Sequence, residues 1–329
     1  MRWNLTLAAI AAALAAPAIA NDSEAEWAVG GLVLKANGDI SMDKEDLYLS
    51  AEEVRVDYVY TNHASEDRDV VIAFPLPALP LQDGWYDYNY PDWDWLGFET
   101  RVNGEKVGYE VHDRAIIGAR DVTDLVKAEG LPLEWFRDGS PAQLLEGMDG
   151  ARREHLVKLG LLRQAESWLE PAWQVQRHYL RVQTFPAGKS VRVSHRYKPL
   201  TGGSVGGALM PEVRNNPEWS PLPEYRQRYC VDDSILAGLD RRMKPSKPGH
   251  VVYYSETWLG YVLSSGANWR GPIKDFRLVI DKGSTDNLVS FCMDGVTKIG
   301  PTQFEVRRTD FEPKGDLDVL ILQFTEVED

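Results

Sequence analysis

The sequence has only two cysteines, no long apolar run beyond its first residues, and no cluster of basic side chains. A membrane-spanning helix needs roughly 20 consecutive apolar residues, so we predict no transmembrane segment in the mature chain. Acidic residues outnumber basic ones by 50 to 36, which gives a formal net charge of −14. Such a surface repels phosphate backbones, and we therefore predict no nucleic-acid partner.

Closely spaced metal ligands are also missing. The six histidines are scattered along the chain, at His63, His112, His155, His178, His195 and His250. Local zinc motifs place histidine or cysteine within a few residues of one another. The sequence therefore predicts no metal site and no cofactor from local motifs. A catalytic triad or a metal site could form only from residues that folding brings together. His195 shares a predicted strand face with apolar residues, which is typical of a core histidine.

Residues 1–20 have the pattern of a secretory signal peptide. Arg2 is followed by a short apolar run from Leu5 to Ala16, and Ala18-Ile19-Ala20 is a small-x-small cleavage signal. We predict a mature N-terminus at Asn21. The alanine-rich signal indicates a bacterial protein that is periplasmic or secreted.

The two cysteines are Cys230 and Cys292. An even count in an exported protein favours a disulfide. A bridge between them would close a loop of about 60 residues, which in the chain-entropy model stabilises the fold by about 4 kcal/mol. The alternative is a pair of buried free thiols.

Period-two alternation predicts a mainly β protein built as one or more antiparallel sandwiches. Alternate residues from Val54 to Tyr60 are apolar, and Asn103-Gly104 suits a type I′ hairpin between two short strands. Later strands are predicted at 173–184, 190–198, 251–264, 275–281, 288–293, 303–308 and 317–324, with 317–324 as a central strand.

Between the β-rich stretches the apolar period becomes helical. Leu144, Leu145 and Met148, and then Leu156, Leu159 and Leu162, recur among charged residues. Ser140-Pro141 indicates a helix start. We predict four regions: a signal peptide at 1–20, an N-terminal β-rich region at 21–120, a helical insertion at 121–170, and a C-terminal β-sandwich region at 171–329.

One short motif resembles a hydrolase nucleophile elbow. The segment from Gly202 to Gly206 fits G-x-S-x-G, which needs a strand before the serine and a helix after it. Prolines at 211, 217, 221 and 223 argue against a helix in 208–223. We therefore interpret the motif as a glycine-rich turn and predict no catalytic residue there.

The segment 83–98 is unusually rich in aromatic residues and aspartate. If exposed, its rings would stack on a sugar or peptide, while the carboxylates accept hydrogen bonds. The predicted ligand-binding residues are Trp85, Tyr88, Trp93 and Trp95. A calcium site on Asp87, Asp92 and Asp94 is an alternative, although the spacing fails the EF-hand pattern. The third possibility is a surface loop that packs its own rings onto the sandwich.

Several blocks, in this order, resemble the bacterial secreted family known as domain of unknown function 4424. They are Asn21–Ser23, Gly30–Val33, Glu45–Ser50, Val54–Val56, Ala73–Pro77, Asp121–Thr123, Thr184–Gly188, His195–Pro199 and Trp269–Ile273. The resemblance covers nearly all of the mature chain. It implies a secreted β-rich protein and implies no activity.

Together these observations predict an exported, non-enzymatic binding or envelope-associated β-sandwich protein. An envelope protein or a glycan is the expected partner. The alternative is a periplasmic hydrolase whose active site is assembled only by folding.

Overall fold

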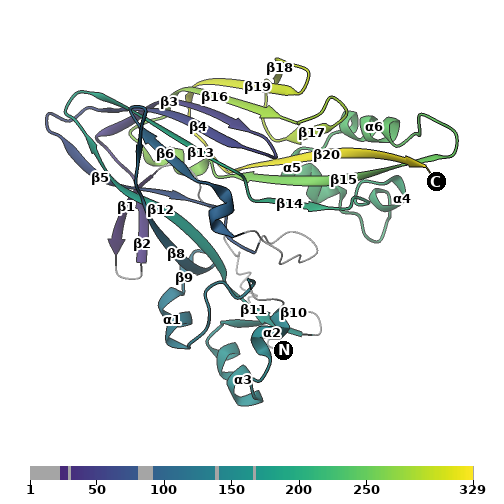
Figure 1. Ribbon diagram of the computed structural model, residues 1–329, viewed down its shortest axis with the longest axis horizontal. Coiled ribbons are helices and arrows are strands. Elements are labelled where there is room, and N and C mark those ends of the chain that lie inside the picture. The colour runs from purple at the N-terminus through teal and green to yellow at the C-terminus, as the bar shows by residue number, and fades with distance from the viewer. Residues whose placement is uncertain (1–22, 29–30, 81–91, 138–140, 166–167, 329) are drawn as a thin grey trace, which may run out of the picture.

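The computed structural model describes residues 23–28, 31–80, 92–137, 141–165 and 168–328. The protein is mainly β, with several antiparallel sheets and few helices, as the sequence predicts (Figure 1). No helix in these ranges is long and apolar enough to cross a membrane.

The six-stranded sheet has the order β2-β1-β5-β12-β8-β9. Its strands are β1 Ser23–Ala28, β2 Gly31–Lys35, β5 Arg68–Pro75, β8 Glu110–Ile117, β9 Arg120–Asp121 and β12 Gln174–Phe185. β12 comes from the later half of the chain and pairs with both β5 and β8. The sheet therefore joins strands that are far apart in the sequence.

The eight-stranded sheet has the order β18-β19-β16-β3-β4-β13-β6-β7. Its strands are β3 Ile40–Leu49, β4 Val54–Asn62, β6 Glu99–Val102, β7 Glu105–Val107, β13 Ser190–Tyr197, β16 Ile273–Asp281, β18 Thr297–Lys298 and β19 Gln303–Phe311. The pairing of β3 with β16 is parallel. The predicted hairpin joins β6 to β7, and both Asn103 and Gly104 have positive φ, as a type I′ turn requires.

A four-stranded sheet has the order β14-β15-β20-β17. Its strands are β14 Thr201–Ser204, β15 His250–Tyr261, β17 Leu288–Phe291 and β20 Leu317–Glu328. β20 lies between β15 and β17, so the prediction of a central strand is confirmed. A separate two-stranded ribbon pairs β10 Leu162–Ala165 with β11 Trp168–Pro171.

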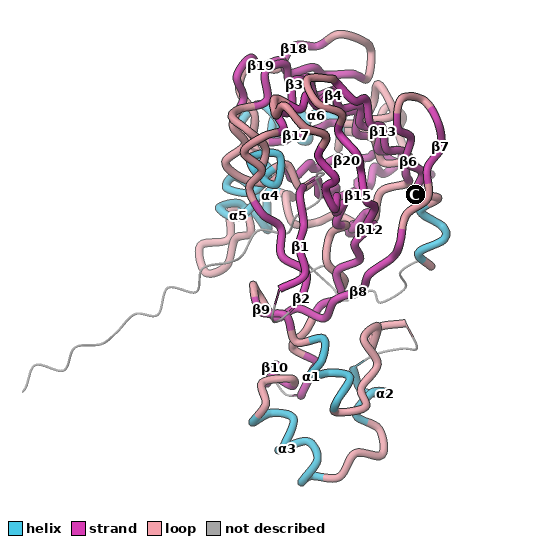
Figure 2. The backbone as a smooth tube through the Cα atoms, turned by 90° about the vertical axis from the view of Figure 1, so that its left-hand side faces the viewer, coloured by secondary structure: helices cyan, strands magenta, loops and turns pink. Residues whose placement is uncertain are grey.

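Three helices lie in the stretch predicted to be helical: α1 Thr123–Ala128, α2 Pro141–Leu145 and α3 Gly150–Lys158. Leu156 is buried as the period predicts, but Leu162 belongs to β10 rather than to a helix. Ser140 lies outside the described residues. Figure 2 shows α1, α2 and α3 projecting from one end of the molecule, away from the strands of the larger sheets.

The expectation that 208–223 holds no helix is wrong. α4 spans Pro211–Arg214, α5 begins within the segment and spans Leu222–Tyr229, and α6 Asp233–Arg242 follows. Proline is tolerated in the first turn of a helix because its missing N–H has no intrahelical acceptor there. Pro211 and Pro223 occupy such positions. The described residues also form two short 3-10 helices, η1 Trp93–Leu96 and η2 Ser264–Asn268.

Aromatic rings join the six-stranded and eight-stranded sheets. Tyr179 of β12 stacks on Phe98, with 3.9 Å between ring centroids. Phe74 of β5 lies 4.7 Å from the ring of His195 on β13. His195 is 1 % exposed, so its placement in the core is confirmed.

The four-stranded sheet forms a further layer because β20 is apolar on both faces. Val319 and Ile321 belong to the main core, where they pack with the eight-stranded sheet. Leu320 and Leu322 face the other way and pack in a second core with α5 and α6. Figure 1 shows these helices covering that side of the small sheet. β20 therefore contributes to both cores, and so does β15, through Leu259 in the main core and Tyr254 in the second.

Candidate functional site

The described part of the predicted aromatic segment is the short helix η1. Trp93 is 7 % exposed, and its Nε1 donates a 2.7 Å hydrogen bond to Glu134. The guanidinium groups of Arg177 and Arg137 lie 4.5 and 5.2 Å from its ring. Arg177 in turn forms a bidentate pair with Asp113. Trp93 thus connects η1 to the insertion and to β12.

The second indole on η1 has a different environment. Trp95 is 46 % exposed, and Lys198 Nζ lies 5.0 Å from its ring centroid. Trp85, Tyr88 and Asp87 lie outside the described residues, so the proposed ligand surface remains a prediction. Asp92 and Asp94 are exposed, and no group of three or more metal-type side chains occurs within the described ranges. The calcium alternative also remains a prediction.

The G-x-S-x-G segment is a glycine-rich edge strand and turn. A Cβ on Gly203 would lie 2.5 Å from the backbone oxygen of Glu256, and one on Gly206 would lie 2.1 Å from that of Tyr254. Ser204 Oγ accepts a hydrogen bond from Gly206 N. The glycines let β14 and its turn approach β15 closely, which explains the motif without catalysis.

The two cysteines form the predicted disulfide, with a Cα–Cα distance of 5.0 Å. Both residues are exposed, so the alternative of buried free thiols is wrong. Cys230 ends α5 in the left-handed conformation, at φ 54°. Cys292 directly follows β17. The bridge therefore fastens the α5–α6 turn to the edge of the four-stranded sheet.

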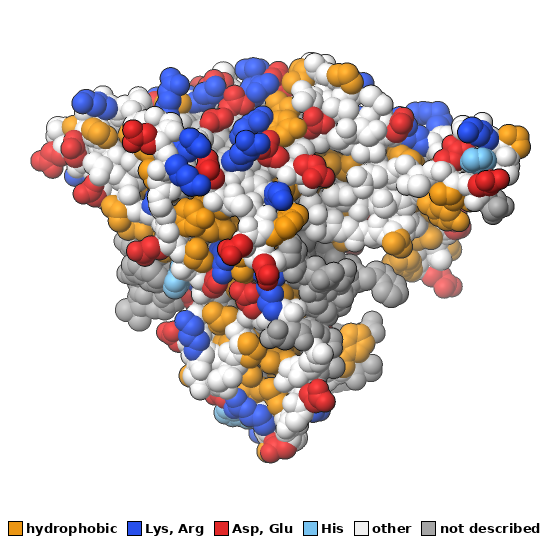
Figure 3. All heavy atoms as spheres, in the orientation of Figure 1, with side chains coloured by type: hydrophobic (Ala, Val, Ile, Leu, Met, Phe, Trp, Pro, Cys, Tyr) orange, Lys and Arg blue, Asp and Glu red, His pale blue; other side chains and the backbone are white. Residues whose placement is uncertain are grey.

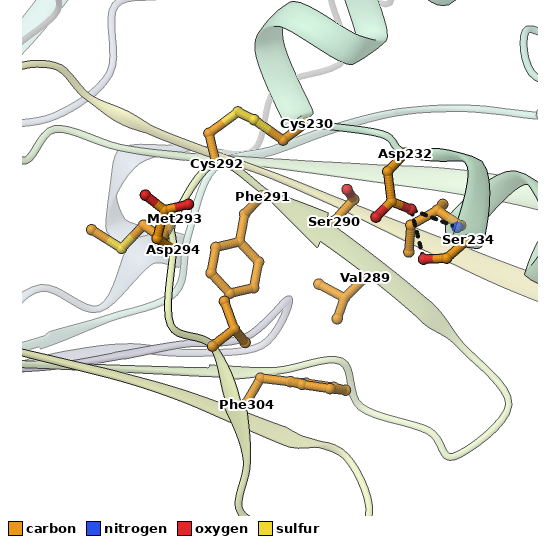
Figure 4. A pocket seen from close by; sticks show the side chains of 12 residues that line it. Cys230, Asp232, Ser234, Val289, Ser290, Phe291, Cys292, Met293, Asp294 and Phe304 are labelled. Atoms are coloured by element: carbon orange, nitrogen blue, oxygen red, sulfur yellow. Dashed lines mark hydrogen bonds between the residues drawn. A yellow bond between two sulfur atoms is a disulfide. The ribbon is translucent and has the colours of Figure 1, made fainter.

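A cavity of about 560 Å³ opens beside this disulfide (Figure 4). Its apolar walls come from α6, β17 and the segment after it, and β19. They comprise Ile235, Val289, Phe291, Met293, Val296 and Phe304. The volume lies in the range of small-molecule sites, which combine apolar walls with a few polar groups.

The polar groups of the cavity are two serines and two aspartates. Asp232 Oδ1 accepts hydrogen bonds from Ser234 Oγ at 2.6 Å and from Ile235 N at 2.9 Å. These bonds, that of Ser234 first, lower the pKa of Asp232, so the carboxylate is ionised at neutral pH. Asp294 lies at the other side of the cavity (Figure 4). Ser290 is buried and donates to the Tyr229 carbonyl at 2.8 Å.

Sequence reasoning missed this cavity, apart from its cysteines. The lining residues come from three segments, 230–235, 289–296 and 304, that no local pattern connects. The disulfide was the one available signal, because a bridge brings distant segments together.

No curated protein matches the sequence. Among solved structures, a protein from Legionella pneumophila that is provisionally named a nutrient binding protein is 13 % identical, with a TM-score of 0.41, over 92 % of this chain and 70 % of that one. An M1 zinc metallopeptidase from Deinococcus radiodurans is 10 % identical, with a TM-score of 0.27, over 87 % of this chain and 43 % of that one. At these scores neither likeness bears on function.

A family model matches nearly the whole chain. It matches residues 20–320, which include every wall of the cavity and both cysteines. The chain belongs to the family described as domain of unknown function 4424.

Proposed function

We propose that this protein is an exported, non-enzymatic binding protein, and that the cavity beside Cys230–Cys292 holds a small organic molecule with an apolar body. The observation that carries the proposal is the combination of about 560 Å³ of space with six apolar side chains and four polar ones. Burial of apolar ligand surface would supply most of the affinity, and the polar groups would orient the ligand.

Two features support the export. The first 20 residues have the order of a signal peptide, from Arg2 to Ala20. The disulfide suits an oxidising compartment such as the periplasm. An envelope protein or glycan as a second partner remains part of the same proposal.

The lining chemistry favours binding over hydrolysis. A serine nucleophile needs an adjacent base, usually a histidine. Of the lining residues that the structure describes, none is histidine or lysine. Ser234 donates to a carboxylate that already caps α6, and Ser290 donates to a backbone carbonyl. Neither hydroxyl is arranged as an activated nucleophile.

The test uses Nile red, a neutral apolar fluorophore, with the full purified protein. Val296 lines the cavity and is 41 % exposed, so Val296→Asp adds a charge to the site while the main core stays intact. We expect saturable binding to the wild type and at least about tenfold weaker binding to the variant, since burying an unpaired charge is costly.

Val182→Asp is the matched control, because Val182 is 71 % exposed on β12 of the six-stranded sheet. It should bind Nile red as the wild type does. Equal loss in both variants, or no saturable binding to the wild type, would contradict the proposal.

A further inference from the structure

The outer face of the eight-stranded sheet carries an ordered array of charged side chains. In the register of β3, β4 and β13, Asp46 lies opposite Asp57, and Asp57 lies opposite Ser194. Two residues along, Lys44 lies opposite Val59, and Val59 lies opposite Arg192. Figure 3 shows basic and acidic side chains interspersed over this part of the molecule.

The residues of these two cross-strand sets, Asp46-Asp57-Ser194 and Lys44-Val59-Arg192, line a second cavity, of about 400 Å³. Gly104, in the turn of the β6–β7 hairpin, forms one of its walls. The hairpin is held against β13 by two hydrogen bonds, one from Asn103 N to the Arg192 carbonyl and one from Arg192 N to Asn103 Oδ1. The wall is therefore fixed by the backbone of the same strand that supplies Arg192 and Ser194.

The charges around the cavity are not all paired. Arg277 bonds to Asp46 at 3.0 Å, and Lys44 lies 3.4 Å from the same carboxylate. Within the described residues, by contrast, no ion pair or side-chain hydrogen bond involves Asp57, the Arg192 guanidinium or the Ser194 hydroxyl. Burial, and then the like charge of Asp46, raise the pKa of Asp57. A cationic ligand group at Asp57 would relieve this repulsion.

Asp57 and Arg192 are diagonal neighbours on adjacent antiparallel strands. Such positions are roughly 7–8 Å apart. Both residues line the cavity of about 400 Å³, whose space can hold a small ligand with one charge of each sign. Ser194, opposite Asp57, offers a hydroxyl at the same place. A guanidinium suits a carboxylate because it donates two parallel hydrogen bonds.

We propose that this cavity binds a small zwitterion of the free amino acid class, with the ammonium group at Asp57 and the carboxylate at Arg192. Ser194 adds a hydrogen bond, and Val59 and Gly104 lie where the ligand's side chain would rest. This site is separate from the cavity beside the disulfide and does not depend on the function proposed for that cavity.

The experiment is equilibrium dialysis of the full protein against each of the twenty standard amino acids, at low salt and neutral pH. For the amino acid that binds best, we also measure the corresponding amine without the carboxylate and the acid without the amine. The amino acid should bind at least about tenfold more tightly than the amine or the acid alone. Raising the salt concentration should weaken its binding. Asp57→Asn and Arg192→Gln should each weaken binding by about tenfold or more.

The controls are Glu328→Gln and Arg120→Gln, which change exposed charges elsewhere and should leave binding unchanged. The proposal is overturned if none of the twenty amino acids binds below about 10 mM, which is the result expected if Asp57 and Arg192 pair with each other in solution. Equally tight binding of the amine or the acid alone, or unchanged binding to Asp57→Asn, would also overturn the proposal.

Discussion

Two tryptophans, two residues apart, differ in almost every contact. Trp93 is nearly buried, donates a hydrogen bond to Glu134, and has two guanidinium groups close to its ring. Trp95 stays half exposed beside Lys198. Sequence patterning treats both as members of one aromatic segment. Their roles separate only because η1 turns one ring toward the insertion.

Replacement of these two residues should therefore have unequal effects. Trp93→Ala removes a packed ring and a hydrogen bond, and we expect it to lower the free energy of unfolding by about 3–5 kcal/mol. Trp95→Ala should change it by less than about 1 kcal/mol. Urea unfolding followed by circular dichroism measures both. Equal losses would show that Trp93 is not a structural connection between η1 and the insertion.

A buried carboxyl group lies in the second core. Glu256, on β15, is 3 % exposed, and its Oε2 accepts hydrogen bonds from Tyr225 at 2.7 Å and from Trp258 at 2.9 Å. Tyr254 and Ser204 also favour the ionised form. Burial outweighs these bonds and raises the pKa of Glu256. Ionisation therefore opposes folding.

The contribution of Glu256 to the free energy of unfolding should therefore fall as pH rises. A folded-state pKa above the unfolded value gives a contribution to stability that is complete below the unfolded pKa and is lost as pH rises through the folded pKa. Glu256→Gln keeps the shape and cannot ionise. Urea unfolding should show that the free energy of unfolding of Glu256→Gln, relative to the wild type, rises as pH is raised above about 4, the ordinary range of a glutamate pKa. Glu328→Gln, at an exposed position, should show no such trend, and a constant difference for Glu256→Gln would contradict the prediction.

At the scale of elements, the disulfide joins a helix to a strand edge. It fastens the end of α5 to the residue after β17, and Ser290 bonds to the Tyr229 carbonyl nearby. α5 and α6 are short, and short helices are marginally stable by themselves, so their own propensity does not hold them on the four-stranded sheet. The bridge and the second core do so together.

Removal of both cysteines should measure the stabilising effect of the bridge. The double variant Cys230→Ser with Cys292→Ser should lose about 2–5 kcal/mol of stability in urea. Peptide mapping of the wild type without reductant should give one linked pair. Two alkylatable thiols in the exported protein would rule the bridge out.

At the scale of the whole molecule, three sheets form two connected cores, with β20 contributing to both. Val319 and Ile321 of this strand pack in the main core, while Leu320 and Leu322 pack in the second core.

N-terminal sequencing of the exported protein tests the cleavage site. We expect the mature chain to begin at Asn21, after Ala18-Ile19-Ala20. A periplasmic or extracellular protein that still begins at Met1 would contradict the prediction of a cleaved signal peptide.

Local sequence determined much of this protein. Alternation placed β4 and β13, Asn103-Gly104 placed the hairpin, and an even cysteine count predicted the bridge, because each depends on neighbouring residues or on the compartment. β3 was missed because the charged residues from Asp43 to Asp46 interrupt its apolar pattern.

Only the tertiary structure decided where the cavities lie. The cavity beside the disulfide needs α6, β17 and β19 together, and the charged cavity needs the register of β3, β4 and β13. Pairing between strands that are more than a hundred residues apart, such as β4 with β13, is set by the packing of the whole core, which no local pattern reports.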